Sequence, residues 1–201
     1  CEPMKIKICG LTRPQDIEAV NRYRPDYVGF VIDFPKSRRS CTPEQVRMLR
    51  RRLSPAIPAV GVTVNQPLAH IAALLESGTI DIAQLHGQED DTYVRALQAR
   101  TGKAVWKAFR IRSQADLEQA RRSSADLILL DNGYGTGEVF DWTLVRDIGR
   151  PFALAGGLNT ENLHDAANMR PRVMDISSGA ETDGVKDADK IRTLIELVRS
   201  F

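Results

Sequence analysis

Residues 152–179, FALAGGLNTENLHDAANMRPRVMDISSG, contain two short and largely apolar runs, Phe152–Ala155 and Val173–Ile176, separated by a polar stretch with a helix-start signal. Small residues follow each run, Gly156-Gly157 after the first and Ser177-Ser178-Gly179 after the second. Both runs are continuous rather than alternating, which is typical of parallel strands buried on both faces. The stretch is therefore predicted to form a strand, a helix and a second, parallel strand.

The same unit recurs along the chain. Eight such runs are each followed by a helical or near-helical segment, and they cover Met4–Cys9, Tyr27–Ile32, Ala59–Val64, Ile80–Leu85, Ala104–Ala108, Leu127–Asp131, Phe152–Ala155 and Val173–Ile176. Eight strand–helix units in one chain predict a closed (β/α)8 TIM barrel. The alternative is an open doubly wound sheet, but no Gly-x-Gly-x-x-Gly follows the first run, where a dinucleotide-binding sheet would carry it.

The length of 201 residues makes this a compact barrel. Typical TIM barrels have about 250 residues, so short loops and at least one reduced helix are expected. The segment after Asp141-Trp142 is expected to be that short helix, whereas Thr160-Glu161-Asn162 and Asp187-Ala188-Asp189 are expected to begin long ones. We predict one barrel domain over 4–201, with 1–3 as an N-terminal tail.

Composition excludes several classes of protein. The chain is 42% hydrophobic and 27% charged, which is typical of a folded globular protein. Its net charge is +2, and the two signs are interspersed, so a nucleic-acid partner is not expected. No run of about 18 apolar residues predicts a membrane span, and no secretory signal is recognisable, so a cytoplasmic location is expected.

The three cysteines, Cys1, Cys9 and Cys41, form neither a disulfide framework nor a pattern with metal-ligand spacing, so reduced thiols and no metal or cofactor are expected. Cys41 is expected to be structural and near the surface. A lone cysteine is most often a small buried hydrophobe, and this interpretation is favoured for Cys9 from its local sequence alone. A thiolate base or nucleophile is the functional alternative, because Cys9 ends the first strand.

Other chemically capable residues also follow strands, where a barrel builds its site. Asp131 closes an apolar run, which would suit a general acid, although an aspartate that turns the chain is equally plausible. Arg39 could hold a carboxylate, but Arg38 is as plausible from its chemistry. His86 and Gln84 end another strand and are candidates to contact a ligand, although a lone histidine there is more often structural.

The small residues after the last two strands predict a phosphate site. Loops after the seventh and eighth strands of a barrel are a recurrent phosphate site, and glycines let backbone N–H groups approach an anion. The candidate residues are Gly156, Gly157, Ser177, Ser178 and Gly179. Either group alone could equally form an ordinary turn, but both together favour phosphate.

Taken together, these motifs resemble the phosphoribosylanthranilate isomerase family of tryptophan biosynthesis. The matching segments run from the first strand to the last helix and include Lys7–Thr12, Pro35–Arg39, Gln84–Gly87, Leu130-Asp131, Gly135-Thr136-Gly137, Phe140-Asp141-Trp142, Ala155–Leu158, Asp175–Gly179, Glu181 and Gly184–Asp187. Their order behind successive strands makes a chance match very improbable. The glycine-rich loop departs from the family at Tyr134, and Asp33 stands where a small or aromatic residue is more usual.

The resemblance implies a cofactor-free Amadori rearrangement of N-(5-phosphoribosyl)anthranilate. It implies that Asp131 is the general acid, that Cys9 is the general base and that Arg39 holds the anthranilate carboxylate, with the glycine and serine loops on the phosphate. The family includes monomers and dimers, and both stay open for this chain. A histidine-pathway isomerase is the rival enzyme, but it would have an aspartate in place of Cys9. A binding barrel without catalysis is the non-enzyme alternative.

Overall fold

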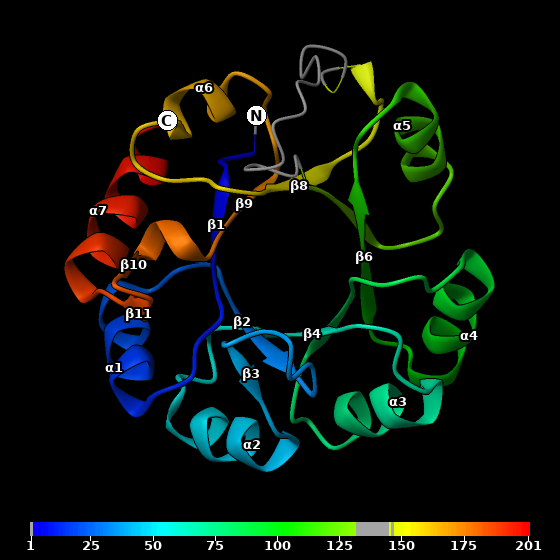
Figure 1. Cartoon of the computed structure of the whole chain (residues 1–201), viewed down its shortest axis with the longest axis horizontal. Helices are drawn as coiled ribbons and strands as arrows, with labels where there is room; N and C mark the ends of the chain where they lie inside the picture. The colour runs from blue at the N-terminus through cyan, green and yellow to red at the C-terminus, as the bar shows by residue number, and fades with distance from the viewer. Residues whose placement is uncertain (1, 132–144, 146) are drawn as a thin grey trace.

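The computed structural model describes residues 2–131, 145 and 147–201 and shows a closed ring of parallel strands inside a ring of helices (Figure 1). The barrel strands are β1 (Lys5–Cys9), β2 (Tyr27–Ile32), β4 (Ala59–Thr63), β5 (Ile82–Leu85), β6 (Ala104–Arg110), β7 (Leu127–Asp131), β8 (Phe152–Ala155) and β9 (Val173–Ile176). β1 pairs with both β2 and β9, and this pairing closes the ring. The predicted TIM barrel is confirmed.

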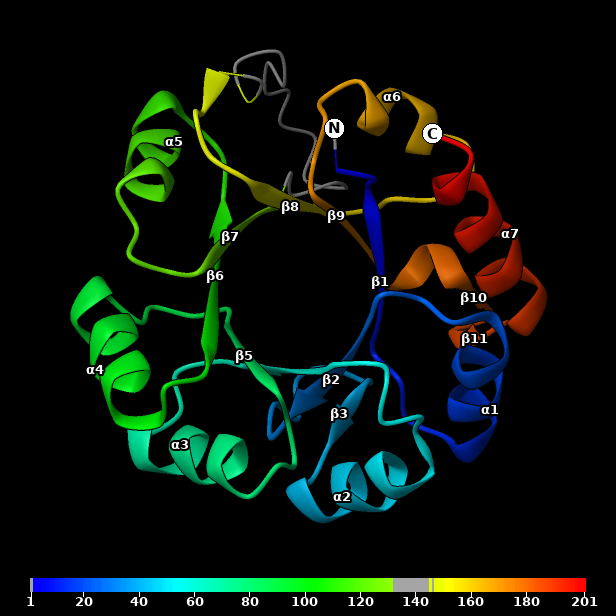
Figure 2. The same ribbon diagram turned by 180° about the vertical axis from the view of Figure 1, so that it is seen from behind.

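Helices surround the strands, as the view from behind also shows (Figure 2). They are α1 (Pro14–Tyr23), α2 (Pro43–Arg52), α3 (Leu68–Glu76), α4 (Asp91–Thr101), α5 (Gln114–Arg121), α6 (Leu163–Ala167) and α7 (Ala188–Arg199). The expectation of a long helix after Asn162 is wrong, because α6 has only five residues. Arg170 adopts a left-handed φ of 54° directly before Pro171, and a residue before proline disfavours helix, so the chain cannot continue one there.

A reduced helix is therefore present, but at α6. The stretch expected to be short, after Asp141-Trp142, falls largely outside the described residues, as do Tyr134, the rest of the glycine-rich loop and Cys1.

The expectation that Cys41 lies near the surface is wrong. This residue lies in β3 (Ser40–Cys41), which pairs with the end of β2, and its side chain is buried near the carbonyl oxygen of Leu11.

Two apolar layers fill the molecule. The larger lies between the strands and the helices. The smaller comes from the strands alone and fills the barrel interior, with Val60, Trp106, Ala108, Leu127, Leu129, Ala153, Ala155 and Val173. Because side chains alternate along a strand, residues two positions beyond this layer face the barrel mouth. Asp131, two residues after Leu129, and Asp175, two residues after Val173, are among them.

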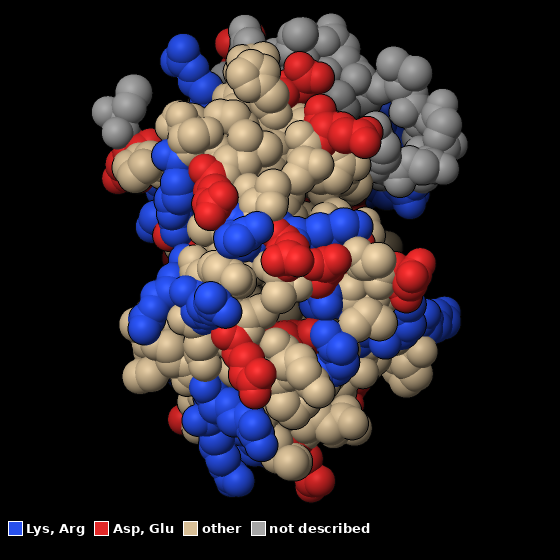
Figure 3. Space-filling view, turned by 90° about the vertical axis from the view of Figure 1, so that its left-hand side faces the viewer, with Lys and Arg blue, Asp and Glu red and all other residues tan. Residues whose placement is uncertain are grey.

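The outer surface carries both charge signs. On the side over α1 and α7, basic and acidic side chains are intermingled (Figure 3). Within the described part of the chain, no helix is long and apolar enough to cross a membrane.

The opposite end of the barrel repeats one hydrogen-bonding device. Asp26, Asp81 and Asp126 each directly precede a strand, and each carboxylate accepts a hydrogen bond of 2.8 Å from a backbone N–H of the neighbouring strand. The partner residue's carbonyl oxygen accepts the aspartate's own N–H in return, at 2.8–3.0 Å. We call these three reciprocal pairs aspartate clamps. They join β1 to β2, β4 to β5 and β6 to β7.

We predict that Asp126→Ala destabilises the protein by about 1–3 kcal/mol, because it leaves the buried N–H of Val105 without its acceptor. Asp126→Asn keeps a side-chain oxygen there and should lose less. Urea unfolding of both variants measures the difference. Turnover should stay unchanged, since this end of a barrel serves stability. Equal stability of Asp126→Ala and the wild type would contradict the role of the clamp.

Candidate active site

Cys9 and Asp131 are the last residues of β1 and β7, two strands separated in the ring by β8 and β9. Both therefore lie at the carboxyl ends of the strands, where a barrel forms its site. The Cys9 thiol is buried against Gly29, the residue beside it in β2. A Cβ atom at Gly29 would lie 2.5 Å from Cys9 Sγ, so only glycine leaves room for the thiol.

Several charges act on the thiol. Burial raises the pKa of Cys9, Lys7 lowers it, Asp175 raises it, and Lys186 and Arg39 lower it. The sum is a pKa above the ordinary thiol value, so the neutral thiol is the resting form. Lys7, Lys186 and Arg39 nevertheless stabilise the thiolate once the thiol of Cys9 has lost its proton. This environment differs from that of a structural cysteine, which is buried among apolar groups alone.

A buried lysine lies below Cys9 on the same strand. Lys7 Nζ donates to Asp175 Oδ2 at 2.9 Å and to Gln84 Oε1 at 2.5 Å. Although burial disfavours its charge, the pairing with Asp175 raises the pKa of Lys7. Asp175 Oδ1 is buried, and no described group bonds to it. Sequence reasoning missed this pair, although opposite charges inside the first and last strands of a closed barrel were an available signal.

A second cluster of charges surrounds Glu181, which begins β10 (Glu181–Thr182) and faces β11 (Val185–Lys186). Arg39 donates to its carboxylate through Nε at 2.8 Å and Nη2 at 2.7 Å. Arg38 and Lys186 also bond to it, at 2.9 and 2.5 Å. Burial alone would raise the pKa of Glu181, but hydrogen bonds from Arg39 and Lys186 hold it at about 2.

The remaining edge of the Arg39 guanidinium is the one between Nη1 and Nη2. Among the described residues, only Glu181 accepts from this guanidinium, and it takes the Nε–Nη2 edge. A guanidinium presents two forks that each match a carboxylate. Glu181 therefore fixes the side chain of Arg39 and leaves its second fork for another anion. Sequence reasoning had selected Arg39 but gave Glu181 no role.

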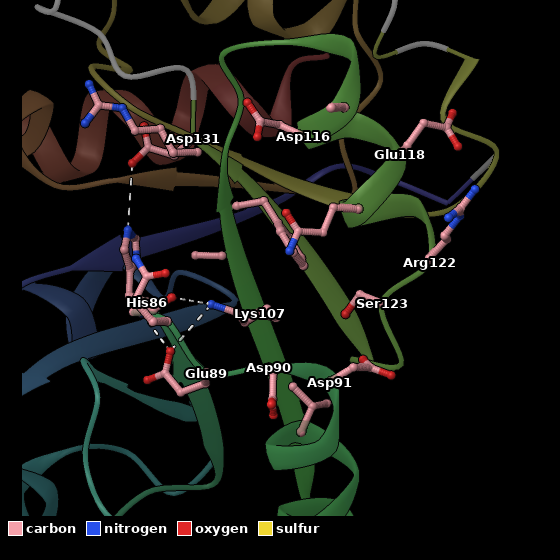
Figure 4. Close-up of a pocket in the computed structure, with 18 of the residues that line it drawn as sticks. His86, Glu89, Asp90, Asp91, Lys107, Asp116, Glu118, Arg122, Ser123 and Asp131 are labelled. Atoms are coloured by element: carbon pink, nitrogen blue, oxygen red, sulfur yellow. Dashed lines mark hydrogen bonds and ion pairs between the residues drawn. The ribbon is translucent and has the colours of Figure 1, made fainter.

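His86 follows β5 and faces Asp131 across the mouth (Figure 4). Its Nε2 lies 3.8 Å from Asp131 Oδ2, and its Nδ1 lies 3.4 Å from Gln84 Nε2. Gln84 itself is buried. A cleft of about 1160 Å³ opens beside His86 and Asp131 and continues between α4 and α5. The structure therefore brings together Gln84, His86 and Asp131, three of the residues singled out from the sequence.

The loops after β8 and β9 touch each other. Gly156 and Gly157 have φ of 101° and 65°, a region that favours glycine. A Cβ atom at Gly179 would collide with the backbone carbonyl oxygen of Leu158. Ser177 lies close to Gly10, because a Cβ atom built there would be 3.2 Å from Ser177 Oγ. The predicted phosphate loops thus lie next to β1 and Arg39.

Over residues 2–131, 145 and 147–201, no three His, Cys, Asp or Glu side chains are grouped so that they could hold an ion.

Comparison with known proteins identifies the family. The family model for N-(5'-phosphoribosyl)anthranilate (PRA) isomerase matches residues 6–197. The chain belongs to the phosphoribosylanthranilate isomerase family. The isomerase of that name from Clostridium kluyveri is 43% identical over 98% of this chain and 99% of its own. The crystal structure of the Thermotoga maritima isomerase superposes with a TM-score of 0.86 at 35% identity and covers 98% of this chain, matching all of its own length.

Another solved phosphoribosylanthranilate isomerase, in complex with reduced 1-(o-carboxyphenylamino)-1-deoxyribulose 5-phosphate, has a TM-score of 0.84 at 35% identity, with coverage of 98% and 100%. The chain is thus an isomerase, and the resemblance inferred from its motifs is confirmed.

In this isomerase, we predict that Glu181→Gln lowers the free energy of unfolding at pH 7 by about 3 kcal/mol, since it removes the carboxylate that pairs with buried Lys186 and with partly buried Arg39. The pKa of Glu181 is about 2 in the folded protein against an ordinary 4.5. Its contribution is therefore complete above pH 4.5 and is lost as the pH falls toward 2. Urea unfolding at several pH values should show the gap between wild type and variant narrowing over that range.

The control is Glu76→Gln, which removes an exposed pair with Arg100. Its effect should stay below about 1 kcal/mol. A Glu181→Gln gap that is small, or that widens in acid, would show that the cluster does not depend on this carboxylate.

Proposed function

We propose that the chain catalyses the Amadori rearrangement of N-(5-phosphoribosyl)anthranilate to 1-(2-carboxyphenylamino)-1-deoxyribulose 5-phosphate in tryptophan biosynthesis. The observation that carries this proposal is that the thiol of Cys9 and the carboxyl group of Asp131 end two strands of one barrel mouth. The names of the relatives support the substrate, and the solved relative that holds the reduced product analogue supports a pocket for both its carboxylate and its phosphate.

Asp131 acts first, as the general acid. Its carboxyl proton passes to the furanose ring oxygen while the bond from that oxygen to C1 breaks. The lone pair of the anthranilate nitrogen forms a double bond to C1, which gives a protonated Schiff base. Asp131 is left as a carboxylate, 3.8 Å from His86 Nε2.

Cys9 acts second, as the general base. Its resting thiol must first lose a proton; the thiolate then removes the proton from C2, the electron pair forms the C1–C2 double bond, and the nitrogen recovers its lone pair. The enolamine then takes up a proton at C1 while its C2 hydroxyl gives up its own proton, so that C2 becomes the ketone carbonyl. C1 is reduced and C2 is oxidised within one molecule, so no external electron carrier is needed. Lys7, Lys186 and Arg39 favour the thiolate that this step requires.

Binding of the two anionic groups follows from the charges around the mouth. The second fork of Arg39 is proposed to hold the anthranilate carboxylate, with Glu181 fixing the guanidinium from the other edge. The backbone of Gly156, Gly157 and Ser177–Gly179 is proposed to hold the phosphate. His86 is proposed to contact the substrate beside Asp131.

We predict that Cys9→Ser and Asp131→Asn each lower turnover by at least ~100-fold, the usual contribution of one acid–base group. Both substitutions keep nearly the same shape, so the fold should be retained. Anthranilate fluorescence of the named substrate follows the reaction, with a chelator control. Turnover near that of the wild type in both variants would overturn the assignment and favour a binding barrel.

We predict that Arg39→Ala raises KM by ~10-fold or more and changes kcat less, because it removes a ground-state contact with the carboxylate. Arg38→Ala is the matched control, since Arg38 also bonds to Glu181 but is 57% exposed. Its KM should change little. Equal effects of the two substitutions would show that the carboxylate is held elsewhere.

A further inference from the structure

A continuous series of polar contacts crosses the barrel from β9 to β7. Asp175 Oδ2 accepts from Lys7 Nζ, which also donates to Gln84 Oε1. Gln84 Nε2 lies 3.4 Å from His86 Nδ1, and His86 Nε2 lies 3.8 Å from Asp131 Oδ2. Lys7 and Gln84 are both buried, so water does not compete at these two links.

The contact between Lys7 and Gln84 determines which nitrogen of His86 carries the proton. An ammonium group can only donate, so the Gln84 atom that meets Lys7 must be the amide oxygen. The other end of the amide is then the NH2 group, which also can only donate. His86 Nδ1 must therefore accept, which requires that it carry no proton. In neutral imidazole the proton is then on Nε2, the nitrogen that faces Asp131.

The histidine cannot easily turn away from this arrangement. The N–H of His86 donates to the Thr63 carbonyl oxygen at 2.9 Å. The next residue, Gly87, is held through both of its backbone polar groups, because Glu89 Oε1 accepts from its N–H at 2.8 Å and Lys107 Nζ donates to its carbonyl oxygen at 2.7 Å. Glu89 and Lys107 are themselves buried beside His86, as Figure 4 shows. A half-turn of the ring would replace both ring nitrogens by carbon and lose both contacts.

We propose that Lys7 and Gln84 are positioning residues that hold His86 as the neutral Nε2–H tautomer, with that N–H directed at Asp131. This inference rests on the acid role proposed for Asp131. It also moves Gln84 from direct contact with the substrate to a place behind His86, since both ends of its amide already have partners.

The tautomer suits the acid step. A general acid must hold its proton until the substrate arrives, and a full positive charge a few ångströms away would favour the carboxylate instead. The amide of Gln84 selects the tautomer with a bare Nδ1, because a hydrogen on that nitrogen would face the NH2 group of Gln84. Once Asp131 has given up its proton, the Nε2–H of neutral His86 can donate to the carboxylate that remains. His86 keeps its proton throughout.

NMR of the imidazole nitrogens of the whole, 15N-labelled protein tests the proposal directly. The chain has three histidines, so His70→Gln and His164→Gln assign the His86 signals by elimination. We expect His86 at neutral pH to show a protonated Nε2 and a bare Nδ1. His70 provides an internal comparison for the nitrogen signals. Its Nε2 also contacts an aspartate, Asp33, but the residue lies on α3 and not in the series of contacts that includes Gln84. A proton on His86 Nδ1 would overturn the proposal.

Gln84→Glu supplies the kinetic test. A carboxylate still accepts from Lys7, but it also accepts from His86, so Nδ1 should gain a proton and kcat should fall ~10-fold or more with KM nearly unchanged. His70→Gln should leave turnover unchanged. A fall confined to KM would return Gln84 to substrate contact, and wild-type kcat would overturn the positioning role. Asp131→Asn, measured in parallel, distinguishes failure of the proposed acid role from failure of the proposed tautomer. Full turnover of Asp131→Asn would overturn the acid role of Asp131, whereas the NMR spectrum reports the tautomer of His86 independently.

Discussion

A positive charge buried just inside the mouth of the barrel is the constraint on which the site depends. Lys7 has no contact with solvent, so it must meet a carboxylate, and Asp175 lies opposite it in the register of β1 and β9. This pairing exists only when the ring closes. The ammonium group of Lys7 also donates to Gln84, and Cys9 lies two residues further along the same strand. The closure of the ring, the charge next to the thiol and the proposed orientation of His86 therefore all depend on this one group.

A buried ion pair such as Lys7–Asp175 contributes little to stability, which explains why it lies above the apolar interior layer and not within it. A buried ion pair rarely improves on well-packed apolar side chains, because removing both charges from water offsets their attraction. The interior layer lower in the barrel is correspondingly apolar. Toward the mouth the described residues include a group of charges in which Lys7, Lys186, Arg38 and Arg39 face Asp175 and Glu181. In this set four cations face two carboxylates, which fits a ligand that brings negative charge.

The sequence predicted what depends on local pattern. The eight strands were located to within about two residues, because burial on both faces leaves continuous apolar runs. Cys9 and Asp131 became candidates because each ends such a run, although only the family resemblance favoured a catalytic role for them. The Lys7–Asp175 pair was missed because its partners are 168 positions apart and meet only through closure. Glu181 and the buried Cys41 depend likewise on contacts between distant segments, and α6 was overestimated because Arg170-Pro171 was not weighed against its start signal.

The aspartate clamps group the strands of the barrel into pairs, although the strands themselves are arranged evenly around the ring. They tie strands in twos, and β8 with β9 has Arg172 where the others have an aspartate, joined through its N–H to the Phe152 carbonyl oxygen. Three β-α-β modules, β1–β2, β4–β5 and β6–β7, are thus clamped, and β8 with β9 forms a last module that has no clamp. Glu2 pairs with Arg172 and Phe201 contacts His164, so both termini lie against the last module. New chain ends placed between modules would leave every module whole, whereas ends placed inside a clamped module would cut the chain between the two strands that its clamp joins.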